Sequence, residues 1–171
     1  MTEIQAYEVL TQHDGYELRR YPPCTVVDTE VTDASFRRAG NAGFGPLLRY
    51  ISGGNQAGRN IAMTAPVIQR DRERAHVVTF VLPAGTRDAP APMDARVRVR
   101  EVPEEIVAVR RYSGSTGEDA YERELALLRA ALQRDGFTEA GEPRLARYDP
   151  PWTPWFMRRN EAQVPVARTT A

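Results

Sequence analysis

The first half of the chain alternates apolar and polar residues in short runs, a pattern typical of β-strands. Two runs flank the turn-like His13-Asp14-Gly15, and a third, rich in β-branched residues, follows Pro22-Pro23. The predicted strands cover residues 7–10, 16–21, 25–31, 61–68 and 76–82. The polar residues 69–74 are predicted as a solvated hairpin connection.

One stretch of the first half has helical spacing instead. We predict a helix from an N-cap at Asp33 to about Ile51, ended by Gly53-Gly54. Its apolar positions are Phe36, Gly40, Phe44, Leu47 and Ile51. Because this segment also contains Gly43, Gly45 and Pro46, its intrinsic helix propensity is low, and packing must hold it.

The second half shows the same order of elements after a proline-rich linker at residues 83–93. Strands are predicted at 96–102, 106–112, 142–148 and 155–166. Between them, a helix is predicted with Thr116 as its N-cap, Asp119 in its first turn and Gly136 at its end. Its buried stripe is predicted to be Tyr121, Leu125, Leu128 and Leu132.

Placing Pro22 over Pro103 aligns Val26 with Val107, and a helix follows in both halves. This suggests a duplicated β-β-α-β-β unit, with repeats at about 5–82 and 94–166, within a single domain over 1–171. The predicted fold class is therefore α+β. Such a duplication favours a curved antiparallel sheet or distorted open barrel, with two helices packed on it about a pseudo-twofold axis.

The composition excludes several functions. The 23 cations and 23 anions cancel, which argues against a nucleic-acid binder, and the absence of Lys excludes a Schiff base or P-loop lysine. The lone Cys24 excludes an intramolecular disulfide and a cysteine metal cage. No apolar run approaches the ~18 residues that span a bilayer, and the start resembles no secretory signal. We therefore expect a soluble, cytoplasmic monomer without a membrane partner.

Common catalytic motifs such as GxSxG, HExxH and the Walker loop are missing. His13 and His76 lie in unrelated contexts and are interpreted as surface residues, so no metal site is predicted, although one histidine suffices as a haem axial ligand. Met63 is interpreted as core filler and Cys24 as an inert thiol.

The segment from Pro150 to Phe156 is unusual, because it combines three prolines with three large aromatic residues. A charged run, Arg158 to Glu161, follows it. One interpretation is a rigid loop whose aromatics plug the bottom of the barrel. The other is an aromatic rim with a basic handle, suited to a flat amphipathic ligand that carries carboxylates.

Several motifs, in order along residues 5–166, resemble the SOUL haem-binding family. They are Tyr16-Glu-Leu-Arg-Arg-Tyr-Pro22, Gly43-Phe44-x-x-Leu47-x-x-Tyr50-Ile51-x-Gly53-x-Asn55, Ile61-Ala-Met-Thr-Ala-Pro-Val67, Tyr148-Asp-Pro-Pro151 and Arg159-Asn160-Glu161. The resemblance implies the duplicated barrel and non-covalent binding of haem or another tetrapyrrole by an apolar groove on the first helix. It implies no axial histidine.

By this resemblance, the positions that fall at the groove are Asn41, Phe44, Leu47, Leu48 and Arg49, with the loop around Trp152 and Thr153 nearby. Arg49 keeps a charge that can meet a haem propionate, whereas Asn41 and Thr153 are neutral. The leading hypothesis is a cytoplasmic protein that buffers or delivers haem without catalysis.

Two alternatives remain, because the predicted barrel is also similar to the effector-binding domains of bacterial drug-responsive regulators. One is a small-molecule hydrolase with Glu161 as its acid. The other is a sensor of amphipathic ligands. A raised pKa of Glu161 at the bottom of a deep pocket would favour the hydrolase, whereas a carboxylate paired with Arg158 or Arg159 would not.

Overall fold

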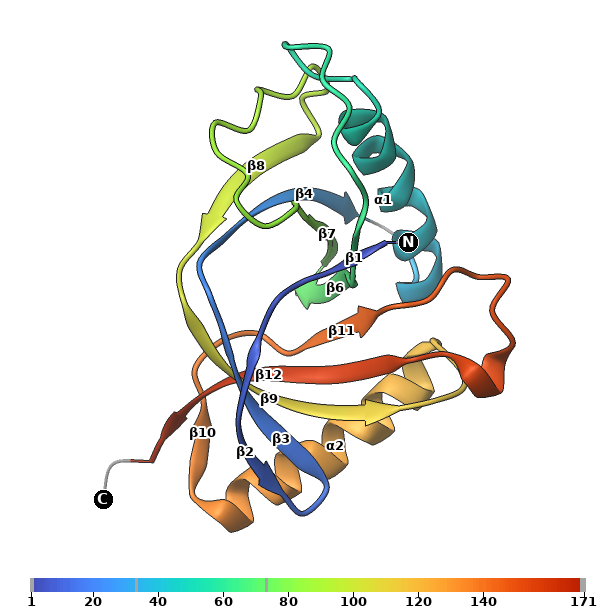
Figure 1. Cartoon of the computed structure of the whole chain (residues 1–171). Coiled ribbons are helices and arrows are strands. Elements are labelled where there is room, and N and C mark those ends of the chain that lie inside the picture. Colours follow the sequence, from blue (N-terminus) through green and yellow to red (C-terminus); the bar gives the residue numbers. More distant parts are fainter. Residues whose placement is uncertain (1, 33, 73, 170–171) are drawn as a thin grey trace. The chain divides into compact units, whose positions relative to one another are not determined.

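The computed structural model describes residues 2–32, 34–72 and 74–169, and the chain forms two compact units (Figure 1). The first unit comprises Met1–Ala6 and Pro23–Pro103, and the second comprises Tyr7–Pro22 and Glu104–Ala171. The N-terminal hairpin therefore belongs to the unit formed mainly by the C-terminal part of the chain.

The first unit contains an antiparallel sheet with the strand order β6-β7-β4-β8. These strands are β4 (Cys24–Thr32), β6 (Val67–Arg72), β7 (Ala75–Val81) and β8 (Val97–Val102). Two short strands, β1 (Glu3–Ile4) and β5 (Thr64–Ala65), pair with each other in parallel.

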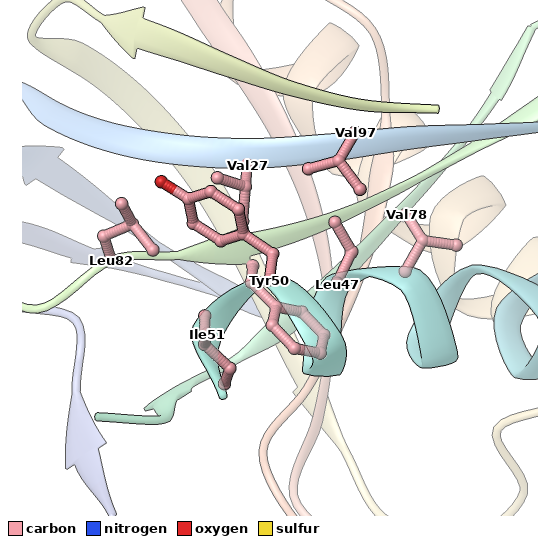
Figure 2. Close-up of a cluster of buried hydrophobic side chains, with 8 residues drawn as sticks. Val27, Leu47, Tyr50, Ile51, Val78, Leu82 and Val97 are labelled. Atoms are coloured by element: carbon pink, nitrogen blue, oxygen red, sulfur yellow. The ribbon is translucent and has the colours of Figure 1, made fainter. Parts of the chain in front are cut away.

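Helix α1 (Phe36–Ile51) packs on β4 and β7. Gly43 allows this close approach, because a Cβ atom there would lie only 2.5 Å from Cγ2 of Val78. Beneath the helix lies one buried cluster (Figure 2), formed by Val27, Leu47, Tyr50, Ile51, Val78, Phe80, Leu82 and Val97. Burial of these side chains holds a helix whose glycines and proline give it little intrinsic stability.

The second unit contains an antiparallel sheet with the strand order β2-β3-β9-β12-β11, and β10 also pairs with β12. The strands are β2 (Glu8–His13), β3 (Tyr16–Tyr21), β9 (Glu105–Tyr112), β10 (Phe137–Glu139), β11 (Arg144–Arg147) and β12 (Asn160–Arg168). A 3-10 turn, η1 (Trp155–Met157), precedes β12.

Helix α2 (Glu118–Asp135) packs on β9, β10 and β12. The predicted stripe is confirmed, since Tyr121, Leu125, Leu128 and Leu132 are all buried. Gly136 ends the helix in the left-handed conformation with φ 78°, as predicted. The N-cap prediction was wrong by one residue, because Gly117 occupies that position instead of Thr116.

The predicted α+β class is confirmed, with one helix on an antiparallel sheet in each unit. The two units share a strand order, since β11-β12-β9-β3 matches β6-β7-β4-β8, and in both a helix follows the third strand. Each sheet takes strands from the other predicted repeat. The hairpin β2-β3 of the first repeat joins the second unit's sheet, where β3 pairs with β9, and β8 of the second repeat pairs with β4. The duplication itself stays a prediction.

The structure corrects several predicted boundaries. The predicted solvated connection over 69–74 is too long, because β6 continues to Arg72 and Gln69 is buried, donating its amide to the carbonyl oxygen of Phe36 at 2.7 Å. Asp71, Arg72 and Arg74 are exposed, and residue 73 lies outside the described residues. The last strand begins at Asn160 instead of residue 155, because η1 follows Pro154. Asp33 lies outside the described residues, and Ser35 is the N-cap of α1.

Neither helix of the described chain is both long and apolar enough to cross a membrane. Within the same residues, no three His, Cys, Asp or Glu side chains gather into a group that would hold a metal ion.

Candidate functional site

The outer face of α1 carries four of the predicted binding residues. Asn41, Phe44 and Leu48 follow one another at intervals of three and four residues, which places them on one side of the helix. Phe44 is 38% exposed and Leu48 is 41% exposed. The ring of Phe44 packs edge-on against buried Phe80, with centroids 5.2 Å apart. This face therefore offers apolar surface on a rigid support.

Leu47 faces the opposite way. It is fully buried in the cluster beneath α1, next to Tyr50 (Figure 2). The hydroxyl group of Tyr50 donates to the carbonyl oxygen of Pro90 at 2.7 Å and so ties the linker to the helix. Leu47 thus supports the exposed face from below and does not line it.

Arg49 follows Leu48 on the exposed side of α1, and its side chain is 64% exposed. Its nearest acidic partner is Asp94, with an Nη to Oδ distance of 4.0 Å. Asp94 is already held by the backbone N–H and guanidinium group of Arg96, at 2.7 to 3.0 Å. Hydrogen bonds from the Arg96 side chain lower the pKa of Asp94 to about 2. Arg49 is therefore a loosely held second partner that can turn to another anion at little cost.

Trp152 and Thr153, the other two predicted residues, belong to the second unit. They lie in the connection between β11 and β12, where Trp152 is 82% exposed and Thr153 is half-buried. Trp155 and Phe156 are also largely exposed, so the interpretation of these aromatics as a barrel plug was wrong. The assignment of Trp152 and Thr153 as ligand contacts stays a prediction.

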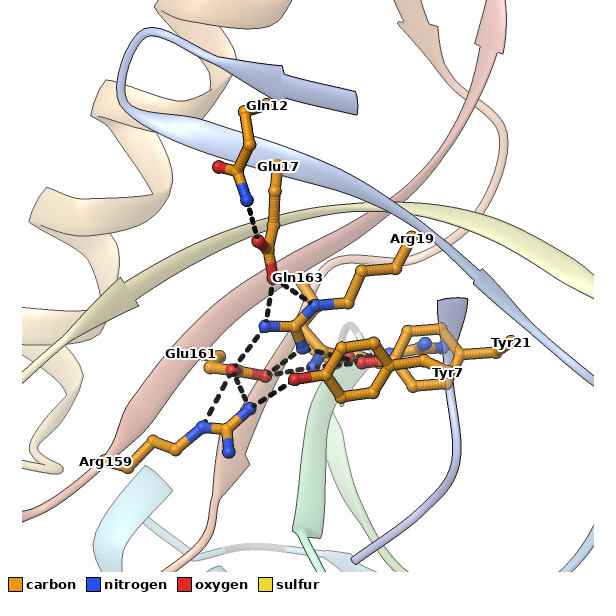
Figure 3. A network of polar contacts seen from close by, with 9 residues as sticks. Tyr7, Gln12, Glu17, Arg19, Tyr21, Arg159, Glu161 and Gln163 are labelled. Carbon is orange, nitrogen blue, oxygen red and sulfur yellow. Dashed lines mark hydrogen bonds and ion pairs between the residues drawn. The ribbon is translucent and has the colours of Figure 1, made fainter. Parts of the chain in front are cut away.

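Glu161 lies at the centre of a buried polar network in the second unit (Figure 3). Its side chain is 0% exposed and accepts five hydrogen bonds. Arg19 donates two, both at 2.9 Å, and Arg159 donates two, at 3.1 and 2.9 Å. The amide of Gln163 donates the fifth at 2.8 Å.

Aromatic and acidic side chains enclose the two guanidinium groups. Arg19 also donates to Glu17 at 2.6 Å and stacks over the ring of Tyr7, 3.9 Å from its centroid. Arg159 stacks at the same distance over Tyr148 and donates to the hydroxyl group of Tyr7 at 3.0 Å. Cation–π contacts of this kind are strongest where water is excluded.

The arginines fix the charge state of Glu161. Burial alone would raise its pKa, but hydrogen bonds and positive charge from Arg19, together with the charge of Arg159, outweigh burial and lower the pKa. The carboxylate is ionised at neutral pH and has no proton to donate as an acid. The geometry is that of a structural ion pair, which argues against the hydrolase hypothesis.

The sequence did not predict that Arg19 and Gln163 contact Glu161. A signal was present, since Glu17, Arg19 and Tyr21 alternate along one strand, as do Arg159, Glu161 and Gln163 along another. Alternating positions point to one face of a strand. In the sheet, β9 lies between β3 and β12 and pairs with both. Arg110 of β9 points to the sheet face that α2 covers, since it pairs with Glu124 of that helix. The alternating residues of β3 and β12 named above lie on the opposite face.

Both histidines are engaged in local contacts. The ring of His13 stacks on Tyr16 with centroids 4.7 Å apart, and its Nδ1 lies 3.7 Å from Asp135. Nδ1 of His76 contacts the carboxylate of Asp71, and its Nε2 lies 3.0 Å from the carbonyl oxygen of Ala34. These contacts stabilise the two hairpins and orient the imidazole rings.

The fold resembles the crystal structure of the EcmrR C-terminal domain, with a TM-score of 0.72 and 13% identity over 95% of this chain and 99% of that one. At that identity the likeness concerns the fold alone. The chain is 29% identical over 160 residues to heme-binding protein 1 of Xenopus laevis, covering 88% of this chain and 84% of the relative.

It is also 29% identical over 133 residues to heme-binding protein 2 of Homo sapiens, which is 73% of this chain but only 65% of the human protein's length. The family model described as SOUL heme-binding protein matches residues 2–165. Since this match covers nearly the whole sequence, the chain belongs to the SOUL heme-binding protein family.

Proposed function

We propose that this protein binds haem or another tetrapyrrole non-covalently on the outer face of α1, and buffers or delivers it in the cytoplasm. The observation that carries the proposal is the exposure of Phe44 and Leu48 on one side of the helix, next to the loosely paired Arg49. An apolar surface bordered by a cation suits a flat macrocycle with carboxylate groups. Membership of the family and the names of its relatives support this choice of ligand.

Apolar contact is expected to supply most of the affinity. Burial of a macrocycle face of a few hundred Å² is worth several kcal/mol at ~25 cal/mol per Å², before the costs of association. An exposed ion pair between Arg49 and a propionate adds about 0.2–1 kcal/mol. Because His13 and His76 are held by other residues, replacing either with Ala should change the affinity by no more than about threefold.

Titration of the purified protein with haemin, followed by the Soret band, tests the proposal. Leu48→Asp should weaken binding by more than about tenfold, because it places a carboxylate against an apolar ring, whereas Arg49→Ala should weaken it by less than about fivefold. Leu127→Asp is the matched control, since Leu127 is a similarly exposed leucine, 49%, on α2. Absence of a saturable Soret change at micromolar haemin, or equal affinity of Leu48→Asp and wild type, would overturn the proposal.

The hydrolase alternative is not proposed, because the carboxylate of Glu161 is enclosed by Arg19 and Arg159 and stays ionised.

A further inference from the structure

Four large apolar side chains project into solvent from one loop of the second unit, residues 148–159 between β11 and β12. They are Trp152, Trp155, Phe156 and Met157, with exposures of 82, 66, 61 and 64%. Together they present on the order of 500 Å² of apolar area, since one large aromatic side chain accounts for 150–250 Å². Exposed apolar area of this size marks a contact surface.

The loop is held in this shape by its own residues. The backbone N–H of Tyr148 donates to the carbonyl oxygen of Arg159 at 3.1 Å and closes the base, while Asp149 accepts from the N–H of Arg159. The guanidinium group of Arg158 donates to the carbonyl oxygens of Thr153 and Pro151, at 2.9 and 2.8 Å. Because the loop is preorganised, little conformational entropy is lost when it binds.

About half of the backbone polar groups at the tip either do not exist as donors or are satisfied within the loop. Pro150, Pro151 and Pro154 have no N–H. The N–H groups of Thr153 and Met157 donate to the carbonyl oxygens of Pro150 and Pro154, at 3.0 and 2.9 Å. Such internal hydrogen bonds lower the cost of bringing a segment to the edge of a bilayer, since hydrocarbon offers no hydrogen bonds. A surface that binds another protein, in contrast, usually has a rim of polar residues around its apolar centre.

The tip itself is uncharged, and its flanking charged residues in the loop are Asp149 before it and Arg158 after it. Residues 150–157 carry no charge, nor do residues 113–117, which approach Trp155 at Gly114. No carboxylate in the described part of the chain pairs with Arg158, at the base of the tip. Tryptophan prefers the boundary between headgroups and hydrocarbon, and arginine is attracted to anionic headgroups.

We propose that this loop docks the protein reversibly on lipid bilayers that contain anionic headgroups. Trp152 and Trp155 lie at the interface, Phe156 and Met157 enter its apolar side, and Arg158 faces the headgroups. The proposal departs from the expectation of no membrane partner, which rested on the lack of a membrane-spanning segment, because this contact spans no membrane. It needs no haem, so it goes beyond the proposed function and is tested without it.

The chain offers a direct probe, because its two tryptophans both lie in this loop. Haem-free protein is mixed with vesicles of phosphatidylcholine alone, or with added phosphatidylglycerol, and both tryptophan emission and vesicle flotation are measured. We expect a blue shift of the emission and co-flotation, stronger with the anionic lipid. Added salt should reduce the preference for the anionic lipid but not abolish binding, since the apolar contact is not screened.

Phe156→Ser/Met157→Ser keeps both tryptophans and should lower the partition coefficient about tenfold or more. Leu127→Ser on α2 is the control and should bind as wild type does. The proposal is overturned if neither vesicle changes the emission or floats the protein, or if the double variant binds unchanged. It is also overturned if the blue shift depends on protein concentration without lipid, which would identify a second copy of the chain as the partner. Failure of haemin binding alone leaves these outcomes untouched.

Discussion

Replacing Glu161 with Gln tests whether the buried network is a structural ion pair. The substitution keeps the size of the side chain but removes its charge. In the wild type, Arg19 donates two hydrogen bonds to the carboxylate, and its side chain is only 3% exposed. In the variant, the same guanidinium group faces a neutral amide. Arg159 loses the same partner. Glu17 remains as the acid that contacts Arg19.

The magnitude follows from the burial of the groups. Removing one partner of a buried ion pair leaves an uncompensated charge and typically costs 3–5 kcal/mol. Because the side chain of Arg159 is 18% exposed, water can solvate part of its charge. We therefore expect Glu161→Gln to lose about 3 to 5 kcal/mol of unfolding free energy at pH 7, nearer the lower figure. For a chain of this size that corresponds to a fall in Tm of roughly 6–20 °C.

Urea unfolding followed by circular dichroism measures the free energy directly. The matched control is Arg20→Gln on the same hairpin, since Arg20 pairs with Glu8 at 3.0 Å but both side chains are exposed, 43% and 66%. This control should cost less than about 1 kcal/mol. If Glu161→Gln costs no more than the control, the carboxylate is not the counterion that holds the two arginines, and the reasoning is wrong.

The pH dependence gives a second check with a definite sign. Burial raises the pKa of Glu161, but Arg19 and Arg159 lower it by more than burial raises it. The folded-state pKa therefore lies below the unfolded value near 4.3. The stability from this group is therefore complete above about pH 4.3 and is lost as the pH falls through the folded pKa. The difference between wild type and Glu161→Gln should be largest at neutral pH and shrink in acid.

Three further predictions concern local structure. Gly43→Ala should destabilise the protein by about 1–3 kcal/mol in thermal unfolding, because its Cβ meets β7 at 2.5 Å, whereas Gly45→Ala, with its nearest atom at 3.7 Å, should be neutral or stabilising. Asn55→Ala should cost about 2–4 kcal/mol in urea unfolding, since this buried side chain makes three hydrogen bonds. Burial and the hydrogen bond to Asp135 raise the pKa of Tyr16 to about 12, so Asp135→Asn should lower it in an NMR titration of the ring.

Local periodicity was enough to predict most of the elements. The stripe of α2 repeats at helical spacing over Leu125, Leu128 and Leu132, and Gly136 ends it by the usual left-handed conformation. Helix α1 was also predictable although its propensity is low, because Phe36, Leu47 and Ile51 mark its buried side. The alternation of apolar and polar residues identified the strands, but not where they end next to prolines. One strand was predicted over 61–68, whereas Pro66 separates β5 from β6.

Pairing between distant strands could not be predicted in the same way. The strand that contains Arg19 pairs with β9, with Arg19 opposite Val107, although the two are far apart in sequence. The Glu161 network depends on that register, since β9 also pairs with β12. Periodicity indicates which face a residue occupies, but not which strand lies beside it. The sequence therefore offered Arg159 as a partner of Glu161, whereas the pairing with Arg19 became visible only in the structure.

The charged residues beside the two exposed apolar surfaces favour ligands that carry negative charge. Two arginines and a glutamine occupy the oxygen atoms of Glu161, so this carboxylate has no hydrogen-bonding position left for a cationic ligand. The cations beside exposed apolar surface, Arg49 on α1 and Arg158 in the loop, are in contrast loosely paired or bound to carbonyl groups. Both proposals therefore require ligands that combine apolar area with negative charge, haem carboxylates in one case and anionic lipids in the other. Because apolar contact dominates in each, added salt should weaken both interactions but eliminate neither.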